Sequence, residues 1–137
     1  IDLKRHRKDL HWYLRQVEEA LIDAIAQLGL TGERVERYTG VWVGIEGSGN
    51  GHAGPRKIAS IGVHARDWVT WHGFALNVNT DLRYFDLIVP CGIADRGVTS
   101  LQQLGWRGAM AEVEGRIAGH FLAVPVDGDQ RYALLDE

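Results

Sequence analysis

The strongest constraint on the fold of this chain is one stretch of helical periodicity that can bury only one of its faces. Between residues 9 and 28, apolar side chains recur at intervals of three and four residues, whereas polar side chains fill the opposite side. The apolar positions are Leu10, Leu14, Val17, Leu21, Ala24, Ile25 and Leu28, and the polar ones are Arg15, Glu18, Glu19 and Asp23. The spacing predicts an amphipathic helix that packs one face on a core and ends at Gly29.

After this helix the period of the sequence changes to two residues, which is typical of strands. Ranges 35–38 and 41–45 predict a hairpin that turns at Thr39-Gly40. Ranges 57–63 and 69–78 predict two consecutive strands, joined by a turn over residues 64–68.

Further helical segments follow these strands. Residues 82–85 predict a short helical turn, and residues 107–121 predict a second helix with Met110, Val113, Ile117 and Phe121 facing inward. Strands in the middle with helices toward both ends predict an α+β domain built on a mainly antiparallel sheet.

Composition narrows the class of protein. The chain has 137 residues, 45% of them hydrophobic, which is enough for one folded domain. A net charge of −3 without a long basic run disfavours nucleic-acid binding. The single cysteine excludes a disulfide-stapled fold and a cysteine-based zinc site. Because no apolar stretch is long enough to span a bilayer and the first residues do not resemble a signal peptide, we expect a cytoplasmic protein.

Two polar segments each allow two interpretations. Residues 47–55 are rich in glycine, like a phosphate-binding loop, but they lack the Lys-Ser/Thr ending of a P-loop, which favours a simple hairpin connection. The basic cluster Lys4, Arg5, Arg7 and Lys8 precedes the first helix. This cluster can dock an acidic partner, or it can be the solvated start of the helix.

Cys91 is the side chain best suited to covalent chemistry. It lies in Pro90-Cys91-Gly92, where proline fixes the path of the chain and glycine permits a tight turn. A thiol in such a turn can attack a substrate carbonyl while neighbouring N–H groups receive the developing negative charge. A lone cysteine is also a common buried apolar residue, so composition leaves both interpretations open.

Two basic residues are candidates to activate this thiol. Lys57 heads an apolar strand, where partial desolvation suits a general base, although a lysine that extends to water is the alternative. His72 lies in mid-strand between Trp71 and Gly73, and fits a pocket-wall or core histidine as well as a base. Spacing alone does not decide which of the two faces the sulfur.

Residues 57–101 carry the most specific pattern in the chain. They contain, in order, Lys-Ile-Ala-x-Ile-Gly-Val, His-Gly-Phe-Ala-Leu-Asn-Val, Ile-Val-Pro-Cys-Gly-Ile and Val-Thr-Ser-Leu. This stretch, together with the helices expected on both sides, resembles the octanoyltransferase family, also called lipoate-protein ligase B or lipoyl(octanoyl) transferases. The resemblance implies the fold shared by biotin- and lipoate-attaching ligases, in agreement with the α+β prediction.

The resemblance also implies an activity. Members of the family transfer an octanoyl group from octanoyl-acyl carrier protein to a lysine of a lipoyl domain. The implied acceptors are the lipoyl domains of 2-oxoacid dehydrogenases and the glycine cleavage H protein. Since the thioester donor is already activated, neither ATP nor a metal or other cofactor is expected. The expected protein is a monomer that binds neither nucleic acid nor membrane.

Site residues follow from the same resemblance. Cys91 takes the position of the acyl-thioester nucleophile, and Lys57 takes that of the lysine that lowers the thiol pKa and moves the proton. The implied substrate-binding positions are Ser60, Ile61, Gly62, Gly73, Phe74 and Ala75, with His72 as pocket wall.

One segment of the family pattern is absent from the printed sequence. Family members carry Arg-Gly-Gly-x-x-Thr-[Phe/Tyr]-His-Gly-Pro-Gly-Gln upstream of the first helix, where it builds another wall of the acyl site. We therefore expect residues 1–137 to form a single catalytic domain that lacks its N-terminal part.

Two other classes of protein compete with this interpretation. An ATP-dependent lipoate or biotin ligase has the same fold but does not need a cysteine at Pro-Cys-Gly. A catalytically inactive module that only binds acyl carriers would not need both Lys57 and Cys91.

Overall fold

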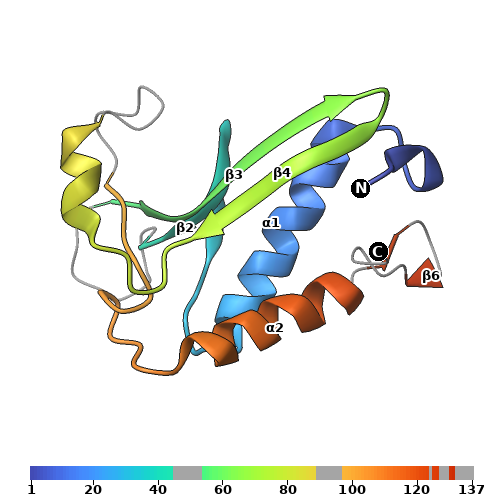
Figure 1. Ribbon diagram of the computed structural model, residues 1–137. Coiled ribbons are helices and arrows are strands. Elements are labelled where there is room, and N and C mark those ends of the chain that lie inside the picture. The colour runs from blue at the N-terminus through green and yellow to red at the C-terminus, as the bar shows by residue number, and fades with distance from the viewer. Residues whose placement is uncertain (45–53, 89–96, 124, 127–129, 132–137) are drawn as a thin grey trace.

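The computed structural model describes residues 1–44, 54–88, 97–123, 125–126 and 130–131 (Figure 1). Cys91 and most of the glycine-rich segment therefore lie outside the described residues. Four antiparallel strands form a sheet in the order β1-β2-β3-β4, and a two-stranded sheet, β5 (Pro125–Val126) with β6 (Gln130–Arg131), lies near the end of the chain. The four strands are β1 (Glu33–Val35), β2 (Tyr38–Val43), β3 (Arg56–Arg66) and β4 (Val69–Leu76).

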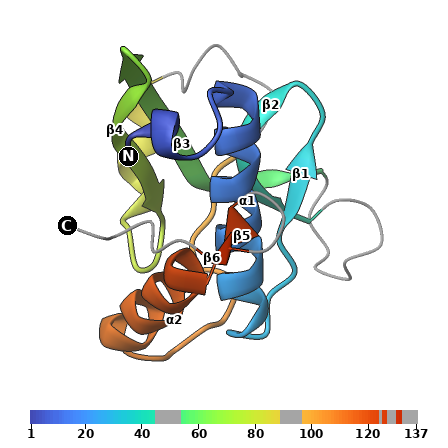
Figure 2. The same ribbon diagram turned by 90° about the vertical axis from the view of Figure 1, so that its right-hand side faces the viewer.

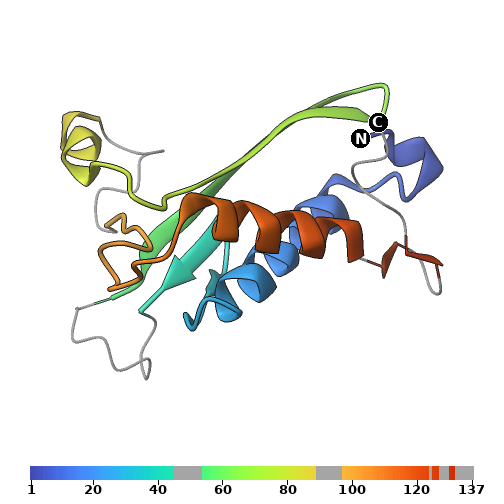
Figure 3. The ribbon, with the colours of Figure 1, turned by 60° about the horizontal axis from the view of Figure 1, so that its bottom comes forward.

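Both long helices lie side by side on one face of the four-stranded sheet (Figures 1 and 3). They are α1 (Leu10–Ala26) and α2 (Met110–Ala123), and two short 3-10 helices, η1 (Leu3–Arg5) and η2 (Leu82–Leu87), flank the sheet. This arrangement confirms the α+β prediction. It leaves the other face of β3 and β4 without a covering helix among the described residues.

The helix predicted between residues 9 and 28 is confirmed. Asp9 is its N-cap, because its carboxylate accepts a hydrogen bond of 3.0 Å from the Trp12 N–H. That bond holds the pKa of Asp9 below its ordinary value. The core-facing stripe differs at its start, where Leu10 is exposed and Tyr13 takes its place in the core.

Glu18 is the clearest departure from the predicted pattern, since it was expected on the polar side of α1 and is fully buried. Its carboxylate pairs with Arg15 and with Arg34 of β1, and it accepts a hydrogen bond of 3.1 Å from the Gly40 N–H of β2. Burial works to lower the pKa of Arg34, but its bonds to Glu19 and Glu18 outweigh burial and raise that pKa. The buried carboxylate thus joins α1 to the first two strands.

The first hairpin turns earlier than the sequence predicted. Its strands pair at Val35 and Tyr38, so the turn is Glu36-Arg37, and Arg37 adopts a left-handed φ of 68°. The predicted turn at Thr39-Gly40 is therefore wrong, because both residues lie inside β2.

The second hairpin is longer than predicted. Strand β3 continues through the predicted turn to Arg66, which pairs with Val69, and only Asp67 and Trp68 form the turn. The 64–68 turn is therefore wrong at its start, since alternating burial continues along β3 to its last residue.

The remaining helical predictions hold except at one end. Residues 82–85 belong to η2, and the second predicted helix is α2, which starts at Met110 rather than at residue 107. Met110 is exposed instead of facing inward, because it occupies the first position of the helix. Val113 and Phe121 are buried as predicted, and Ile117 packs against them.

We predict that Glu18→Gln destabilises the protein strongly. Removing the charge weakens the bonds of a buried group to Arg15 and Arg34, and because these guanidinium groups are partly exposed we expect a cost of about 1–3 kcal/mol. Urea unfolding measures the change in the free energy of unfolding. Glu19→Gln is the matched control, because Glu19 is exposed and pairs with the same Arg34, so its loss should cost at most about 1 kcal/mol. Equal effects of the two substitutions would contradict the assignment of Glu18 as the buried anchor.

Candidate functional site

A β-bulge decides where the side chain of Lys57 points. Val41 pairs with Ala59 and Trp42 pairs with Lys57, so Ile58 is one extra residue on β3. Ile58 and Ala59 both belong to the buried core on the helix side. Alternation resumes on either side of the bulge, which places Lys57 on the open face of the sheet, the same face as exposed Ser60.

Two groups border the Lys57 side chain. Its ammonium Nζ lies 4.9 Å from the ring centroid of buried Trp42, a cation–π contact. The side chain also passes over Gly40, where a Cβ would stand 3.1 Å from Lys57 Cε and 2.6 Å from the Ala59 carbonyl oxygen. Gly40 is in turn held by Glu18 through its N–H. The lysine is therefore held by an indole face and by a strand position that accepts only glycine.

The backbone of Lys57 is paired with the chain that follows the Pro-Cys-Gly motif. Lys57 N donates to Gly97 O over 2.9 Å, and Thr99 N donates to Lys57 O over 2.9 Å. Val98 forms a parallel bridge to Lys57. Thr99 is fully buried, and its carbonyl accepts a bond of 3.1 Å from the side chain of Asn77, just beyond β4. Residues 97–99 are thus fixed beside Lys57.

Cys91 itself lies outside the described residues, so the structure gives no position for its thiol. Gly97 is the sixth residue after Cys91.

The open face of the β3–β4 hairpin carries most of the other predicted substrate-binding residues. Ser60 pairs with Ala75 and Gly62 pairs with Gly73, and all four line an open groove of about 440 Å³. No atom lies within 4 Å of the position a Cβ would take on Gly62. The two opposed glycines therefore leave bare backbone in the middle of the groove.

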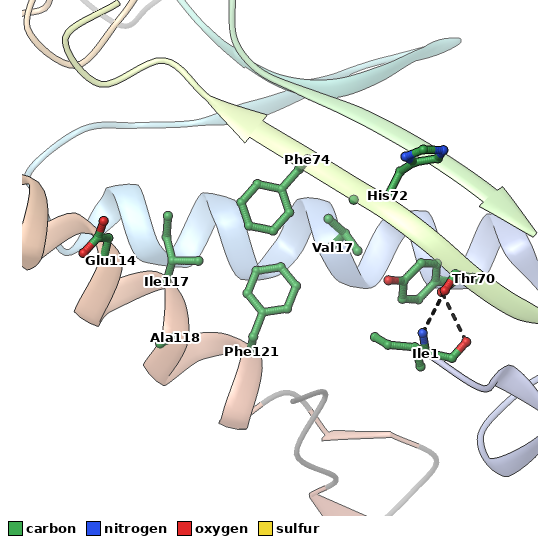
Figure 4. Close-up of a pocket in the computed structure, with 11 residues that line it drawn as sticks. Ile1, Val17, Thr70, His72, Phe74, Glu114, Ile117, Ala118 and Phe121 are labelled. Atoms are coloured by element: carbon green, nitrogen blue, oxygen red, sulfur yellow. Dashed lines mark hydrogen bonds between the residues drawn. The ribbon is translucent and has the colours of Figure 1, made fainter. Parts of the chain in front are cut away.

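Two predicted substrate-binding residues face the helices instead. Ile61 pairs with Phe74, and both pack against the buried core. The Phe74 ring stacks on Phe121 of α2 with centroids 5.1 Å apart (Figure 4). The backbone of Phe74 borders the groove while its ring belongs to the other face of β4.

His72 departs from regular strand geometry. Its φ is +67°, a left-handed conformation that a residue with a side chain seldom adopts, and its side chain is exposed. In Figure 4, Phe74 points toward the helices and His72 points away from them. His72 pairs with Val63, six residues from Lys57, so at about 3.3 Å per residue the two basic groups are separated by about 20 Å along the hairpin. The structure does not bring them together.

An apolar cavity of about 420 Å³ lies on the helix side of β4 (Figure 4). The rings of Tyr13, Phe74 and Phe121 line it, with Val17 and Ile117 between them. Glu114 and Thr70 also line this cavity. The backbone N–H and the hydroxyl of Thr70 both donate hydrogen bonds to the carbonyl of Ile1.

Sequence reasoning missed the residues that hold Lys57 in place. Gly40 offered a signal, because a glycine inside a strand often marks a close approach of another group. For Trp42 the only signal was its place in β2 between Val41 and Val43, because successive side chains of a strand point to opposite faces. Glu18 offered none, since its polar character placed it on the solvent side of α1.

In the described part of the chain, no three histidine, cysteine, aspartate or glutamate side chains gather closely enough to hold a metal ion. None of the helices in the same residues combines the length and apolar character that crossing a membrane requires.

Comparison with known proteins identifies what this arrangement resembles. Residues 1–122 match the model of the lipoyl protein ligase A/B catalytic domain. An octanoyltransferase of Myxococcus xanthus is 50% identical over 123 residues, which cover 89% of this chain and 33% of that protein. An octanoyltransferase of Synechococcus elongatus is 49% identical over 121 residues, 88% of this chain and 48% of that protein. The chain thus spans between a third and a half of the length of these relatives.

A solved structure shows the same fold. The bi-partite lipoate protein ligase of Thermoplasma acidophilum superimposes with a TM-score of 0.65 at 20% identity, over 85% of this chain and 46% of that one. The resemblance to the fold of lipoate-attaching enzymes, expected from the motifs, is confirmed.

We predict that Gly40→Ala disturbs both stability and the position of Lys57. The new methyl group would collide with the Ala59 carbonyl, a backbone atom that cannot move freely, at a φ of +128° that favours glycine. Overpacking of this kind costs about 1–3 kcal/mol in the free energy of unfolding, measured by urea denaturation. Gly62→Ala is the matched control, because its methyl group meets nothing within 4 Å and should change stability little. A neutral Gly40→Ala would show that the close approach of Lys57 imposes no constraint.

Proposed function

Because this chain belongs to the lipoyl protein ligase A/B catalytic domain family, we propose that it is the catalytic part of an octanoyltransferase that works through a Cys91 thioester and Lys57. The donor is octanoyl-acyl carrier protein, and the acceptor is a lysine of a lipoyl domain, as in the 2-oxoacid dehydrogenases and the glycine cleavage H protein. The relatives named octanoyltransferase, at about half identical residues over most of this chain, support the reaction class.

The observation that carries the proposal is the pairing of Lys57 with the chain that leaves the Pro-Cys-Gly motif. Cys91 is six residues from Gly97, and an extended chain covers at most about 3.6 Å per residue, so the Cα atoms of Cys91 and Gly97 are at most about 22 Å apart. His72 lies about 20 Å from Lys57 along the same hairpin, at a position that Gly97 does not approach through any described hydrogen bond. The direct pairing of Lys57 with residues 97 and 99 is therefore the ground on which we propose Lys57, and not His72, as the partner of the thiol.

The first half-reaction exchanges one thioester for another. In the starting state, the Lys57 ammonium stabilises the Cys91 thiolate, which is the nucleophilic form. The thiolate attacks the carbonyl carbon of the donor, a bond forms from Sγ to that carbon, and the bond from the carbon to the carrier sulfur breaks. The ammonium gives a proton to the departing carrier sulfur. Lys57 is left neutral beside the acyl-enzyme.

The second half-reaction forms the amide. The neutral acceptor amine attacks the acyl-enzyme, its nitrogen bonds to the carbonyl carbon, and the bond to Sγ breaks to restore the thiolate. The amine proton goes to neutral Lys57, which becomes an ammonium again. Lys57 gives one proton to the carrier sulfur in the first step and takes one from the acceptor amine in the second. Lys57 thus ends in its starting state, and the cycle needs neither ATP nor a metal ion.

The groove on the open face is the proposed site for the acyl chain. Gly62 and Gly73 expose bare backbone there, and Ser60 and Ala75 form its edge nearer Lys57. Ile61 and Phe74 act from the other face by holding the strands on the core, and His72 forms the wall at the far side of the glycines.

We predict that the full-length protein gains the mass of one octanoyl group when it is mixed with octanoyl-acyl carrier protein. Peptide mass spectrometry should place the group on Cys91, and hydroxylamine should remove it because it cleaves thioesters. Cys91→Ser should gain no label. Stable labelling at a lysine or serine, or a reaction that requires ATP, would contradict the thioester mechanism and favour a ligase.

We predict that Lys57→Ala and Lys57→Arg both lose transfer to the acceptor lysine, since neither has a side chain that can take up the amine proton. The two variants should differ in the alkylation of Cys91 by iodoacetamide, followed against pH. In Lys57→Ala the thiolate loses its cation, so the midpoint of alkylation moves to higher pH, whereas Lys57→Arg keeps a positive charge and keeps part of the reactivity near neutral pH. His72→Ala is the control and should leave the midpoint unchanged. A shift in His72→Ala without one in Lys57→Ala would identify a Cys-His pair instead.

A further inference from the structure

The basic segment before α1 lies against the tip of the β3–β4 hairpin (Figures 1 and 2). Leu3 N donates to the Trp68 carbonyl over 2.8 Å, and Asp2 forms an antiparallel bridge with Val69. Lys4 Nζ lies 3.3 Å from the Asp67 carboxylate in the turn. Two segments more than sixty residues apart in sequence therefore form one surface.

Positive charge on this surface exceeds negative charge. The cations are Lys4, Arg5, Arg7, Lys8 and Arg66, and the carboxylates are Asp2, Asp9 and Asp67. Each carboxylate is already engaged: Asp67 by Lys4, Asp9 by the Trp12 N–H and Arg7, and Asp2 by the Lys4 N–H. Arg5, Lys8 and Arg66 are exposed and take part in no ion pair among the described residues. In a chain of net charge −3, this is a local site for an acidic partner.

Trp68 adds an apolar anchor in a strained conformation. Asp67 and Trp68 form a two-residue turn with φ of 50° and 62°, a geometry for which Asn-Gly is the favoured sequence. A tryptophan there is costly to the backbone, and 38% of it remains exposed. Val69 and Trp71 beside it are also exposed, and Trp71 stands against the His64 ring with centroids 4.7 Å apart. Exposed aromatic side chains among arginines are typical of binding hot spots.

We propose that these six residues, Arg5, Lys8, Arg66, Trp68, Val69 and Trp71, form a hairpin-tip surface that docks the acidic carrier protein delivering the acyl group. The proposal rests on the proposed function, which supplies a carrier as donor. It assigns the basic cluster of residues 4–8 to a partner rather than to the solvated start of α1.

The position of the hairpin-tip surface favours the donor over the acceptor. Arg66 lies nine residues beyond Lys57 on β3, which is about 30 Å at 3.3 Å per residue, and six residues, or about 20 Å, beyond the groove residue Ser60. A carrier holds its acyl group at the end of a long flexible arm, so it can dock at the tip and deliver the acyl group along the groove toward Lys57. An acceptor presents a single lysine side chain, which is much shorter than the separation, and so must approach Lys57 more closely.

The test compares direct binding of acyl carrier protein to full-length wild type and to Arg5→Glu/Arg66→Glu. The carrier is used without its acyl group, so binding is measured whether or not transfer occurs. Charge reversal should raise the Kd at least about tenfold, and wild-type binding should weaken as salt is added. Arg37→Glu/Arg116→Glu is the matched control, with the same change in charge on exposed residues of the β1–β2 turn and of α2, and should leave the Kd unchanged. An equal loss in both variants would overturn the proposal.

Kinetics then separate docking from chemistry. Arg5→Glu/Arg66→Glu should raise KM for octanoyl-acyl carrier protein at unchanged kcat, and should leave both transfer from a small octanoyl thioester and KM for the lipoyl domain unchanged. A rise in KM for the lipoyl domain alone would assign the surface to the acceptor and overturn the proposal. If Arg5→Glu/Arg66→Glu instead abolished self-association of the wild type, the surface would belong to a second copy of this chain, which would also overturn the proposal. Wild type that binds the carrier but transfers nothing would contradict the proposed function and leave docking intact.

Trp68→Gly distinguishes docking from folding. Glycine suits the left-handed turn, so this variant should keep or raise the melting temperature while it loses the apolar anchor and binds the carrier at least about tenfold more weakly. Undiminished binding by Trp68→Gly would overturn the role of Trp68.

Discussion

The buried carboxylate of Glu18 is the interaction on which the arrangement of this domain depends. A charge without access to solvent is stable only where partners surround it, and Glu18 has Arg15 on its own helix, Arg34 on β1 and the Gly40 N–H on β2. These partners fix the position of α1 against the first hairpin. The Lys57 side chain passes over the same Gly40 whose N–H binds Glu18. Gly40 therefore lies between the Glu18 carboxylate and the candidate catalytic lysine. Glu18 of α1 and Lys57 of β3 thus both contact β2 at Gly40.

The bulge at Ile58 determines which side chains of β3 face the helices and which face the open side of the sheet. A regular strand would send Lys57 toward the helices, where Ala59, Ile61 and Val63 already fill the core. One extra residue lets both Ile58 and Ala59 pack inward and turns Lys57 outward onto the indole of Trp42. The helix-covered face supplies stability, and the open face keeps a lysine, a pair of glycines and a groove available to a substrate.

How far the sequence alone predicts this structure depends on whether a signal is local. The periodicity of residues 9–28 and of the two long strands reports burial along one element, and the elements it predicts are present. The position of the first turn could not be predicted, because Gly40 looks like a turn residue until Ala59 and Lys57 from another strand are known to lie against it. The burial of Glu18 needs Arg34, sixteen residues away, and so has no local signal. The family motifs indicated Lys57 and the groove residues directly, but not Trp42, whose contact with Lys57 exists only once β2 and β3 pair.

The β3–β4 hairpin carries backbone strain at two places, and both concern its open side. His72 and Trp68 each adopt a left-handed φ that a glycine would adopt more readily, and both side chains are partly open to solvent among the described residues. At His72 the altered backbone turns the side chain out of the helix-facing row in which Thr70 and Phe74 lie, and adds an imidazole to the wall of the groove. At Trp68 it presents an indole among arginines at the tip. In the function that we propose, the hairpin connects the groove to the proposed docking surface, with about 20 Å between Ser60 and Arg66, and so suits a donor that carries its acyl group on an arm.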